Sequence, residues 1–438
     1  MAFIEPISET LAKIKVVGIG GGGSNAVSSM VDIQQINGVQ FIAMNTDLQA
    51  LNACSAQVRV QLGPDRTHGL GSGADPEVGG EAAAESIEEI KAHLQGADMI
   101  FIAAGLGGGT GTGAAPIVAQ IARDLGALTV GVVTKPFAFE GKRRMNQAEQ
   151  GVNELRTKVD ALIVIPNEKL LEIVPTDVPL RDAFRIADEV IGNAVQGISD
   201  LITSTGLINV DFADVKTIMK NAGSALMGIG HADGEQRAQK AAEMAVKSPL
   251  LDVDIEGSTG ILLNIVGDTS LTMHEVNTAA KIVAESAHKG ANIIFGADVD
   301  PEIEGIRVTV IATGFDTNLT ELQLDGLRRT SDEELLNQID SRFNEDGEGV
   351  ETDDKFDDIN SGLNKNIHVT GEDDDEIIAG LREEVKKMEK VEPTVTEEPK
   401  PVSNNGNGSK SSSTTINEPQ EEKAPEKKDF WSILTGGK

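Results

Sequence analysis

Short apolar runs alternate with amphipathic stretches through the first part of the chain. The apolar runs lie at residues 13–20, 39–47, 98–105, 128–137 and 160–167, and helical patterns separate them. Buried parallel strands are typically short and almost continuously apolar, and the helices that connect them are amphipathic. This region therefore predicts an α/β domain built on a parallel sheet.

The pattern changes between Leu180 and Thr203, where apolar residues lie all around a helical repeat. A helix that is apolar on every side is normally buried, so we expect a long central helix here. Strand patterns at 260–268, 291–300 and 306–315 surround a helical stretch at 273–288. They predict a second domain, of the α+β class, beyond the central helix.

Apolar residues become sparse after residue 316, and acidic residues, Lys, Ser, Asn and Pro replace them. Such a composition cannot bury enough apolar surface to fold, so residues 317–428 are predicted to form a disordered acidic linker. The last ten residues, 429–438, differ because they hold a cluster of large apolar side chains. The cluster consists of Phe430, Trp431, Ile433 and Leu434. An apolar cluster behind a polar tail predicts a short docking peptide.

Composition excludes several classes of protein. The 438 residues carry a formal net charge of -32, which disfavours binding to nucleic acid or to anionic lipid. The single cysteine, Cys54, cannot form an internal disulfide, and the first residues lack the pattern of a signal peptide. Since no apolar run approaches the roughly 20 residues of a membrane span, we expect a cytoplasmic protein without direct membrane insertion.

Two glycine-rich turns carry the candidate chemistry. The first, at residues 18–25, follows a predicted strand and opens a helix, where backbone N–H groups and a positive helix end favour phosphate. It also fits the G-x-G-x-x-G pattern of dinucleotide-binding proteins. The second turn, GGGTGTG at residues 107–113, again opens a helix and adds two hydroxyl groups, from Thr110 and Thr112. Five glycines allow the main chain to approach a polyphosphate closely, so this turn predicts a phosphate-binding loop.

The chain has no G-x-x-x-x-G-K-[ST] motif, and neither glycine turn contains Lys or Arg. GGGTGTG without a P-loop resembles the tubulin and FtsZ superfamily, and the similarity to FtsZ extends over roughly residues 13 to 316. Six further motifs match in order: GIGGGGSNAV, AMNTDLQAL, GLGSGADPE, TKPFAFEGKRR, IPNEKLL and GLINVDFADV. The resemblance implies a GTP- and GDP-binding GTPase with Mg²⁺, a Rossmann-like GTPase domain and assembly into filaments.

The resemblance also assigns residues to the nucleotide site. The residues implied to contact phosphate are Gly20, Gly21, Gly22, Gly23, Asn25, Gly71, Gly73, Gly107, Gly108, Gly109, Thr110, Gly111 and Thr112, within loops that include Asn45, Thr46 and Gly69. The segment implied to contact the sugar and phosphate contains Pro136, Phe139, Glu140 and Arg144, and the residues implied to form the base pocket are Asn167, Phe184 and Asp188. Asp47 is implied to organise Mg²⁺ through the nucleotide and water.

Several of these residues have an alternative, purely structural interpretation. Asp47 could be a turn residue at a strand end, and Phe184 could be an ordinary core side chain. Glu140 and Arg144 could form an i,i+4 surface pair worth roughly 0.3–0.5 kcal/mol. The residues alone leave these alternatives open.

A second acidic motif lies in the sequence Asn209-Val-Asp211-Phe-Ala-Asp214. Acidic residues at a helix start also cap the helix and complement its dipole. The resemblance implies more: Asp211 and Asp214 enter the nucleotide site of the next subunit and orient the attacking water, and Asn209 helps to position them. Such an active site is shared between adjacent subunits of a head-to-tail filament.

With the family in view, we expect a flexible N-terminus over 1–12, a GTP-binding domain over 13–178 and the central helix over 179–203. A GTPase-activating domain over 204–316 precedes the linker. The resemblance implies a bacterial cell-division protein at the mid-cell division site, whose terminal peptide docks on membrane-anchoring and regulatory division proteins. A non-hydrolysing tubulin-like scaffold and an NAD-dependent oxidoreductase are the alternative functions.

Overall fold

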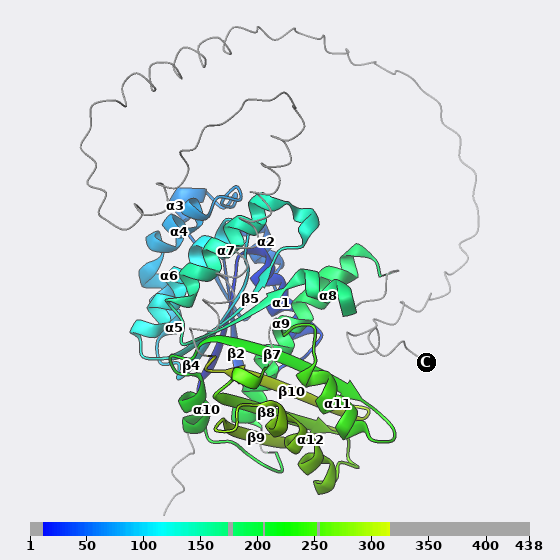
Figure 1. The fold of residues 1–438 in the computed structure, drawn as a ribbon. Coiled ribbons are helices and arrows are strands. Elements are labelled where there is room, and N and C mark those ends of the chain that lie inside the picture. The colour runs from blue at the N-terminus through cyan, green and yellow to red at the C-terminus, as the bar shows by residue number, and fades with distance from the viewer. Residues whose placement is uncertain (1–11, 174–177, 205, 252–254, 316–438) are drawn as a thin grey trace, which may run out of the picture. The chain divides into compact units, whose positions relative to one another are not determined.

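The computed structural model describes residues 12–173, 178–204, 206–251 and 255–315 (Figure 1). The predictions for the first eleven residues, the acidic linker and the terminal peptide lie outside these residues. Within them, the strands form one ten-stranded sheet in the order β3-β2-β1-β4-β5-β6-β7-β10-β8-β9.

The first seven strands of the sheet order are parallel neighbours. They are β1 (Ile14–Ile19), β2 (Val39–Asn45), β3 (Val58–Gln61), β4 (Met99–Gly105), β5 (Leu128–Lys135), β6 (Ala161–Pro166) and β7 (Gly223–Ala232). The remaining strands are β8 (Gly260–Gly267), β9 (Asn292–Val299) and β10 (Ile306–Thr313). β10 runs antiparallel to β7 and β8, and β8 pairs with β9 in parallel. This topology confirms a parallel α/β part followed by a mixed part.

Helices cover both faces of the sheet. They are α1 (Gly20–Asp32), α2 (Leu48–Ala53), α3 (Pro64–Thr67), α4 (Pro76–Glu85), α5 (Ile87–Leu94), α6 (Thr110–Asp124), α7 (Lys142–Arg156), α8 (Asn167–Ile173), α9 (Leu180–Thr203), α10 (Phe212–Met219), α11 (Arg237–Val246) and α12 (Met273–Ser286). No helix in this part of the chain combines the length and the apolar composition that crossing a membrane requires.

Successive strand residues pack on opposite faces, as the pleat of a strand dictates. Val16 packs in the apolar cluster that includes α1 and α9, whereas Val17 packs in the cluster that includes α4 to α7. A third cluster joins α11 and α12 to β8 and β10. Strands buried on both faces explain why the first apolar runs are nearly continuous.

The prediction of a buried central helix is confirmed. α9 spans 24 residues, packs against α1 and contacts β5 and β8. Nearly every residue between Ile186 and Leu201 is buried. The helix therefore bridges the parallel strands and the mixed strands that follow them.

Candidate functional site

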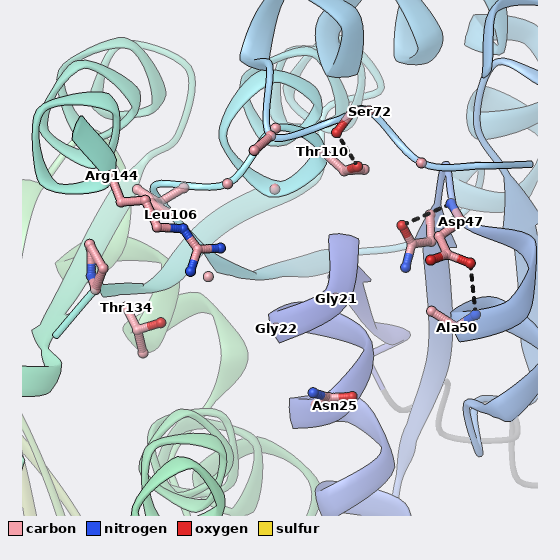
Figure 2. Close-up of a pocket in the computed structure, with 18 of the residues that line it drawn as sticks. Gly21, Gly22, Asn25, Asp47, Ala50, Ser72, Leu106, Thr110, Thr134 and Arg144 are labelled. Carbon is pink, nitrogen blue, oxygen red and sulfur yellow. Dashed lines mark hydrogen bonds between the residues drawn. The ribbon is translucent and has the colours of Figure 1, made fainter. Parts of the chain in front are cut away.

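A cavity of about 630 Å³ lies at the carboxyl ends of β1, β2, β4, β5 and β6 (Figure 2). Turns that follow the parallel strands meet there, which is the usual place for a ligand in an α/β sheet. The residues that the sequence predicted and that line the cavity are Gly21, Gly22, Asn25, Asn45, Thr46, Asp47, Gly71, Gly73, Gly108, Gly109, Thr110, Gly111, Pro136, Glu140, Arg144, Asn167, Phe184 and Asp188.

Four predicted phosphate residues do not line the cavity: Gly20, Gly23, Gly107 and Thr112. Gly20 has a φ of +71°, and a Cβ there would lie 2.8 Å from the backbone nitrogen of Gly111. The Thr112 hydroxyl oxygen accepts a hydrogen bond from the Gly107 N–H at 2.9 Å. These residues build the wall behind the cavity, and their contribution to nucleotide binding stays a prediction.

The two glycine turns are packed against each other and against neighbouring loops. A Cβ on Gly22 would lie 3.1 Å from the Cα of Gly105, and one on Gly109 would collide with the Ser72 hydroxyl. Among the glycines of these two turns, Gly21 is the one at which a Cβ would have no atom within 4 Å. A Cβ on Gly108 would approach only Arg144, at 4.0 Å. Most glycines here thus permit loop-to-loop contact, while Gly21 and Gly108 open directly on the cavity.

Three loops meet at one hydroxyl group. The Thr110 Oγ1 lies 2.6 Å from Thr46 Oγ1 and 3.0 Å from Ser72 Oγ, and all three side chains are buried. The loop that carries Ser72 has positive φ at Gly69, Gly71 and Gly73. Glycine adopts this backbone conformation without steric cost, which explains the glycine content of the loop. The hydrogen bonds fix the three loops relative to each other around the cavity.

Asp47 combines a structural contact with a place on the cavity. Its Oδ1 accepts hydrogen bonds from the N–H groups of Gln49 and Ala50, at 2.8 and 3.0 Å, so it caps α2. No group of three or more His, Cys, Asp or Glu side chains suited to a metal occurs among the described residues. A lone carboxylate fits Mg²⁺ that is held mainly by phosphate oxygens and water.

Glu140 and Arg144 form the predicted i,i+4 ion pair, and both line the cavity. The other carboxylate oxygen of Glu140 accepts a hydrogen bond from the Phe137 N–H at 2.9 Å. The pair therefore holds the guanidinium of Arg144 beside Gly108 (Figure 2). Arg144 supplies the fixed positive charge that the glycine turns lack.

An aromatic cluster supports one end of the cavity, and Phe184 is its lining residue. The ring of Phe184 packs edge-on against Phe137, with centroids 5.3 Å apart, and Phe137 stacks on Phe139 at 5.0 Å. Phe184 lines the cavity and remains 40% exposed, so it is not an ordinary core side chain. Phe139 is 62% exposed and does not line the cavity.

Polar groups on α8 and α9 line the cavity together with Phe184. The Oδ1 of Asn167 is buried and has no hydrogen-bond partner among the described residues. Burial raises the pKa of Asp188 to about 8, and the carboxylate of Glu189 adds to the shift. Buried polar groups without partners are costly, so this end of the cavity is suited to a polar ring with N–H groups.

The second acidic motif lies elsewhere. Asn209, Asp211 and Asp214 are exposed and do not line the cavity. Asp211 caps α10, because its Oδ1 accepts a hydrogen bond from the Ala213 N–H at 3.3 Å. Ile208, just before Asn209, pairs with β9, at the far end of the sheet order from β1 and β2.

Other lining residues were not named individually in the sequence analysis, although Leu70 and Ser72 lie in the predicted phosphate-sensing loop 69–73. These lining residues are Ala50, Leu70, Ser72, Ala74, Gly105, Leu106, Thr134 and Ala187. Ser72 and Thr134 carry hydroxyl groups within motifs that had been recognised, GLGSGADPE and TKPFAFEGKRR. Ser72 lies in a glycine-rich loop, and Thr134 lies near the end of a predicted strand. These two positions were the signals in the sequence that could have indicated a place in the site.

Comparisons with known proteins show the family of this chain. Residues 13–175 match the model of the Tubulin/FtsZ family GTPase domain, and residues 223–316 match the FtsZ family C-terminal domain. An empty FtsZ dimer from M. jannaschii is 50% identical, with a TM-score of 0.68 over 71% of this chain and 90% of that chain. The chain belongs to the tubulin/FtsZ family of filament-forming GTPases.

Two more distant structures share the fold. A GTPγS-bound protofilament of CetZ2 from Haloferax volcanii is 21% identical, with a TM-score of 0.60 over 73% of this chain and 99% of that chain. A GDP-bound monomer of CetZ1 from the same organism is 23% identical, with a TM-score of 0.61 over the same shares. GTP and GDP binding is consistent with the family.

Proposed function

We propose that this chain binds GTP in the cavity, assembles head to tail and hydrolyses GTP with acidic side chains of the neighbouring copy. The observation that carries the proposal is the separation of the two functional parts. The cavity lies at the carboxyl ends of β1, β2, β4, β5 and β6, whereas the segment with Asn209 and Asp211 is hydrogen-bonded to β9.

The separation is too large for one chain to bridge. β9 lies four strands beyond β6 in the sheet order, which corresponds to roughly 19 Å at about 4.8 Å per strand. The turn after α10 also binds Asp160, the residue before β6, through the N–H of Gly223 at 3.0 Å. Asn167, at the cavity, follows the other end of β6, so the two parts lie at opposite strand ends. A group that orients water must be within hydrogen-bond reach, so this separation supports a second copy as the source of the acids.

The cavity residues have distinct roles in this proposal. Backbone N–H groups at the starts of α1 and α6 bind the phosphates, and Arg144 adds a positive charge. Asp47 would hold Mg²⁺ together with the phosphates; the ion would neutralise charge on the terminal phosphate. The carboxylates of Asp211 and Asp214, from the next copy, orient the attacking water. Phosphoryl transfer depends mostly on such positioning and charge management.

The base end of the cavity matches guanine. Phe184 offers an aromatic face, and the unpartnered Oδ1 of Asn167 and the carboxylate of Asp188 offer acceptors for N–H groups. Adenine lacks the two neighbouring N–H donors that this arrangement would satisfy. The acceptors therefore support GTP over ATP.

Mixing two inactive variants tests the shared site. Asp214→Ala keeps the cavity but loses a water-orienting carboxylate, and we expect a loss of roughly 10²- to 10⁴-fold in turnover. Gly21→Leu keeps the acidic segment but fills the open space at the cavity, where a Cβ meets no atom within 4 Å. It is preferable to a change at Gly109, whose side chain would collide with Ser72.

Activity should reappear when the two variants are mixed, because some junctions pair a GTP-loaded Asp214→Ala copy with intact acids from Gly21→Leu. It should rise with total protein concentration. Folding is checked by circular dichroism and co-assembly by sedimentation. A co-assembled mixture of folded, singly inactive variants that releases no phosphate would show that Asp214 does not act across the junction.

We also propose that the filaments form the division ring at mid-cell, with residues 429–438 docking on membrane-anchoring or regulatory division proteins. The family relationship and the apolar cluster around Trp431 support this role. Residues 13–178 would act as the GTP-binding domain and residues 204–316 as the domain that activates hydrolysis in the next subunit.

A further inference from the structure

The segment between α9 and α10 has the alternation of an extended strand. Leu207, Asn209 and Asp211 are exposed, whereas Ile208 and Val210 are half-buried and pack against the apolar clusters. Alternating exposure places side chains 207, 209 and 211 on one outer side. The polar side chains of Asn209 and Asp211 therefore lie on the same side of an extended segment.

Backbone hydrogen bonds fix this segment to the edge of the sheet. The N–H of Ile208 donates to the carbonyl oxygen of Ala297 at 3.0 Å, and the N–H of Ala297 donates back at 3.1 Å. The pair forms an antiparallel bridge with β9. This bridge lies one residue before Asn209, so it fixes the positions of Asn209 and Asp211 relative to β9.

A side-chain contact fixes the start of the segment. The hydroxyl of Ser204 donates to Oδ2 of Asp298 at 2.6 Å, and Oδ1 of Asp298 accepts from the Val299 N–H at 2.8 Å. A Cβ on Gly206 would lie 2.8 Å from the Ala297 carbonyl oxygen and 3.1 Å from the Asp298 carboxyl carbon. The backbone at Gly206 therefore packs closely against Asp298, and both carboxylate oxygens of Asp298 accept hydrogen bonds.

Helix stability does not explain a carboxylate at this position. Ser204 is the C-terminal capping residue of α9, and a negative charge at the carboxyl end of a helix opposes the helix dipole. Asp298 also lies near other charged groups: burial raises the pKa of Asp200 to about 6, Arg307 lowers it, and Asp298 and Asp300 add to the rise. His231 is the neighbour of Arg307 across β7 and β10. Helix capping therefore does not account for the Ser204–Asp298 contact.

We infer that Asp298 is a positioning residue for GTP hydrolysis, which acts through Ser204 to set where the acidic segment enters the cavity of the next copy. The inference rests on the proposed function, because it requires Asp211 and Asp214 to act across the junction. Water-orienting groups lose much of their effect when they shift by about 1 Å. Asp298 does not line the cavity of its own chain, and in this inference it acts only through its contact with Ser204.

Ser204→Ala is the primary test, because it removes the contact and leaves the carboxylate in place. We expect the turnover of assembled protein to fall by about 10- to 100-fold, with unchanged GDP affinity and melting temperature. Ser204→Thr keeps the hydroxyl and should restore turnover. Ser55→Ala is the matched control, because Ser55 donates to Asp32 at the same 2.6 Å, away from the segment and the cavity. Asp298→Ala should reproduce the Ser204→Ala effect.

Mixing shows which side of the junction is impaired. Ser204→Ala mixed with Gly21→Leu should recover turnover per occupied cavity, because Gly21→Leu supplies an intact segment. Turnover of Ser204→Ala equal to that of Ser55→Ala would overturn the inference and leave the shared site standing. Reduced turnover that mixing does not recover would also overturn it, because the defect would then lie in its own cavity or fold. If Asp214→Ala and Gly21→Leu fail to complement, the proposed function falls, and the inference with it.

Discussion

Asp188→Asn should invert the base preference of the cavity from guanine to xanthine. Guanine presents two neighbouring N–H donors, at N1 and N2, which the carboxylate of Asp188 can accept. Xanthine keeps the N1 donor but has a carbonyl oxygen in place of the N2 amino group. An asparagine amide offers one acceptor and one donor. The acceptor can pair with N1–H and the donor with the C2 carbonyl oxygen of xanthine, whereas in guanine the donor would face the N2 amino group.

The size of the effect follows from the burial of Asp188. Hydrogen bonds to a charged group contribute about 1.5–3 kcal/mol each, so two contribute about 3–6 kcal/mol. At pH 7 the carboxyl must first lose its proton, because its pKa in the empty cavity is about 8. One pKa unit costs about 1.4 kcal/mol. The net loss of guanine binding in Asp188→Asn should therefore be about 1.6–4.6 kcal/mol, or roughly 15- to 2,400-fold.

The assay is titration calorimetry with GDP and XDP at protein concentrations below the assembly threshold. Asp182→Asn is the matched control, because Asp182 lies on the same helix and does not line the cavity. The control should keep the guanine preference. If Asp188→Asn binds GDP within threefold of the unchanged protein and still prefers it to XDP, Asp188 does not read the base.

Three further outcomes are expected. Between pH 6 and 8.5, GDP affinity should rise toward pH 8 and then level off, because guanine binds the ionised form of Asp188, whose pKa is about 8; calorimetry across this range should show no slope for Asp188→Asn. Arg144→Ala should weaken GTP binding by about 1.5–3 kcal/mol, whereas Arg143→Ala, outside the cavity lining, should change the dissociation constant little. Removal of residues 429–438 should leave GTP-dependent sedimentation near normal but abolish recruitment to the division site; normal localisation by microscopy would exclude this peptide as the docking element.

The sequence predicted the strands that lie in long, mostly apolar runs and missed those whose apolar pattern is short or interrupted. β3 has only four residues and alternates apolar with polar positions, so it resembled a loop. β7 contains Gly228 and Gly230, which weaken a strand pattern. Both are required by packing, because a Cβ at either position would collide with a carbonyl oxygen of α11, that of Ala245 or Ala241. Such a requirement exists only in three dimensions.

The candidate site was predictable at the level of motifs and less so at the level of atoms. GGGTGTG indicated a phosphate loop, yet a sequence cannot distinguish a glycine that opens on a ligand, such as Gly108, from one that contacts another loop, such as Gly109. Likewise, Ser72 lies in a recognised motif, but its contact with Thr110 depends on how two distant loops meet. Asp47 shows that two interpretations of one residue can both hold, since it caps α2 and lines the cavity.

The length of α9 explains why hydrolysis would require assembly. Its first turns carry Phe184 and Asp188 into the cavity, and its last residue precedes Ser204, where the acidic segment begins. A helix of 24 residues is about 36 Å long, and burial along most of its length prevents it from bending to bring the two ends together. In a head-to-tail contact the acidic end of one copy meets the open cavity of the next, and each addition leaves one unused cavity and one unused segment. A contact of this kind propagates as a filament, so under the proposed function the helix that separates the two halves of the site also makes polymerisation the means of joining them.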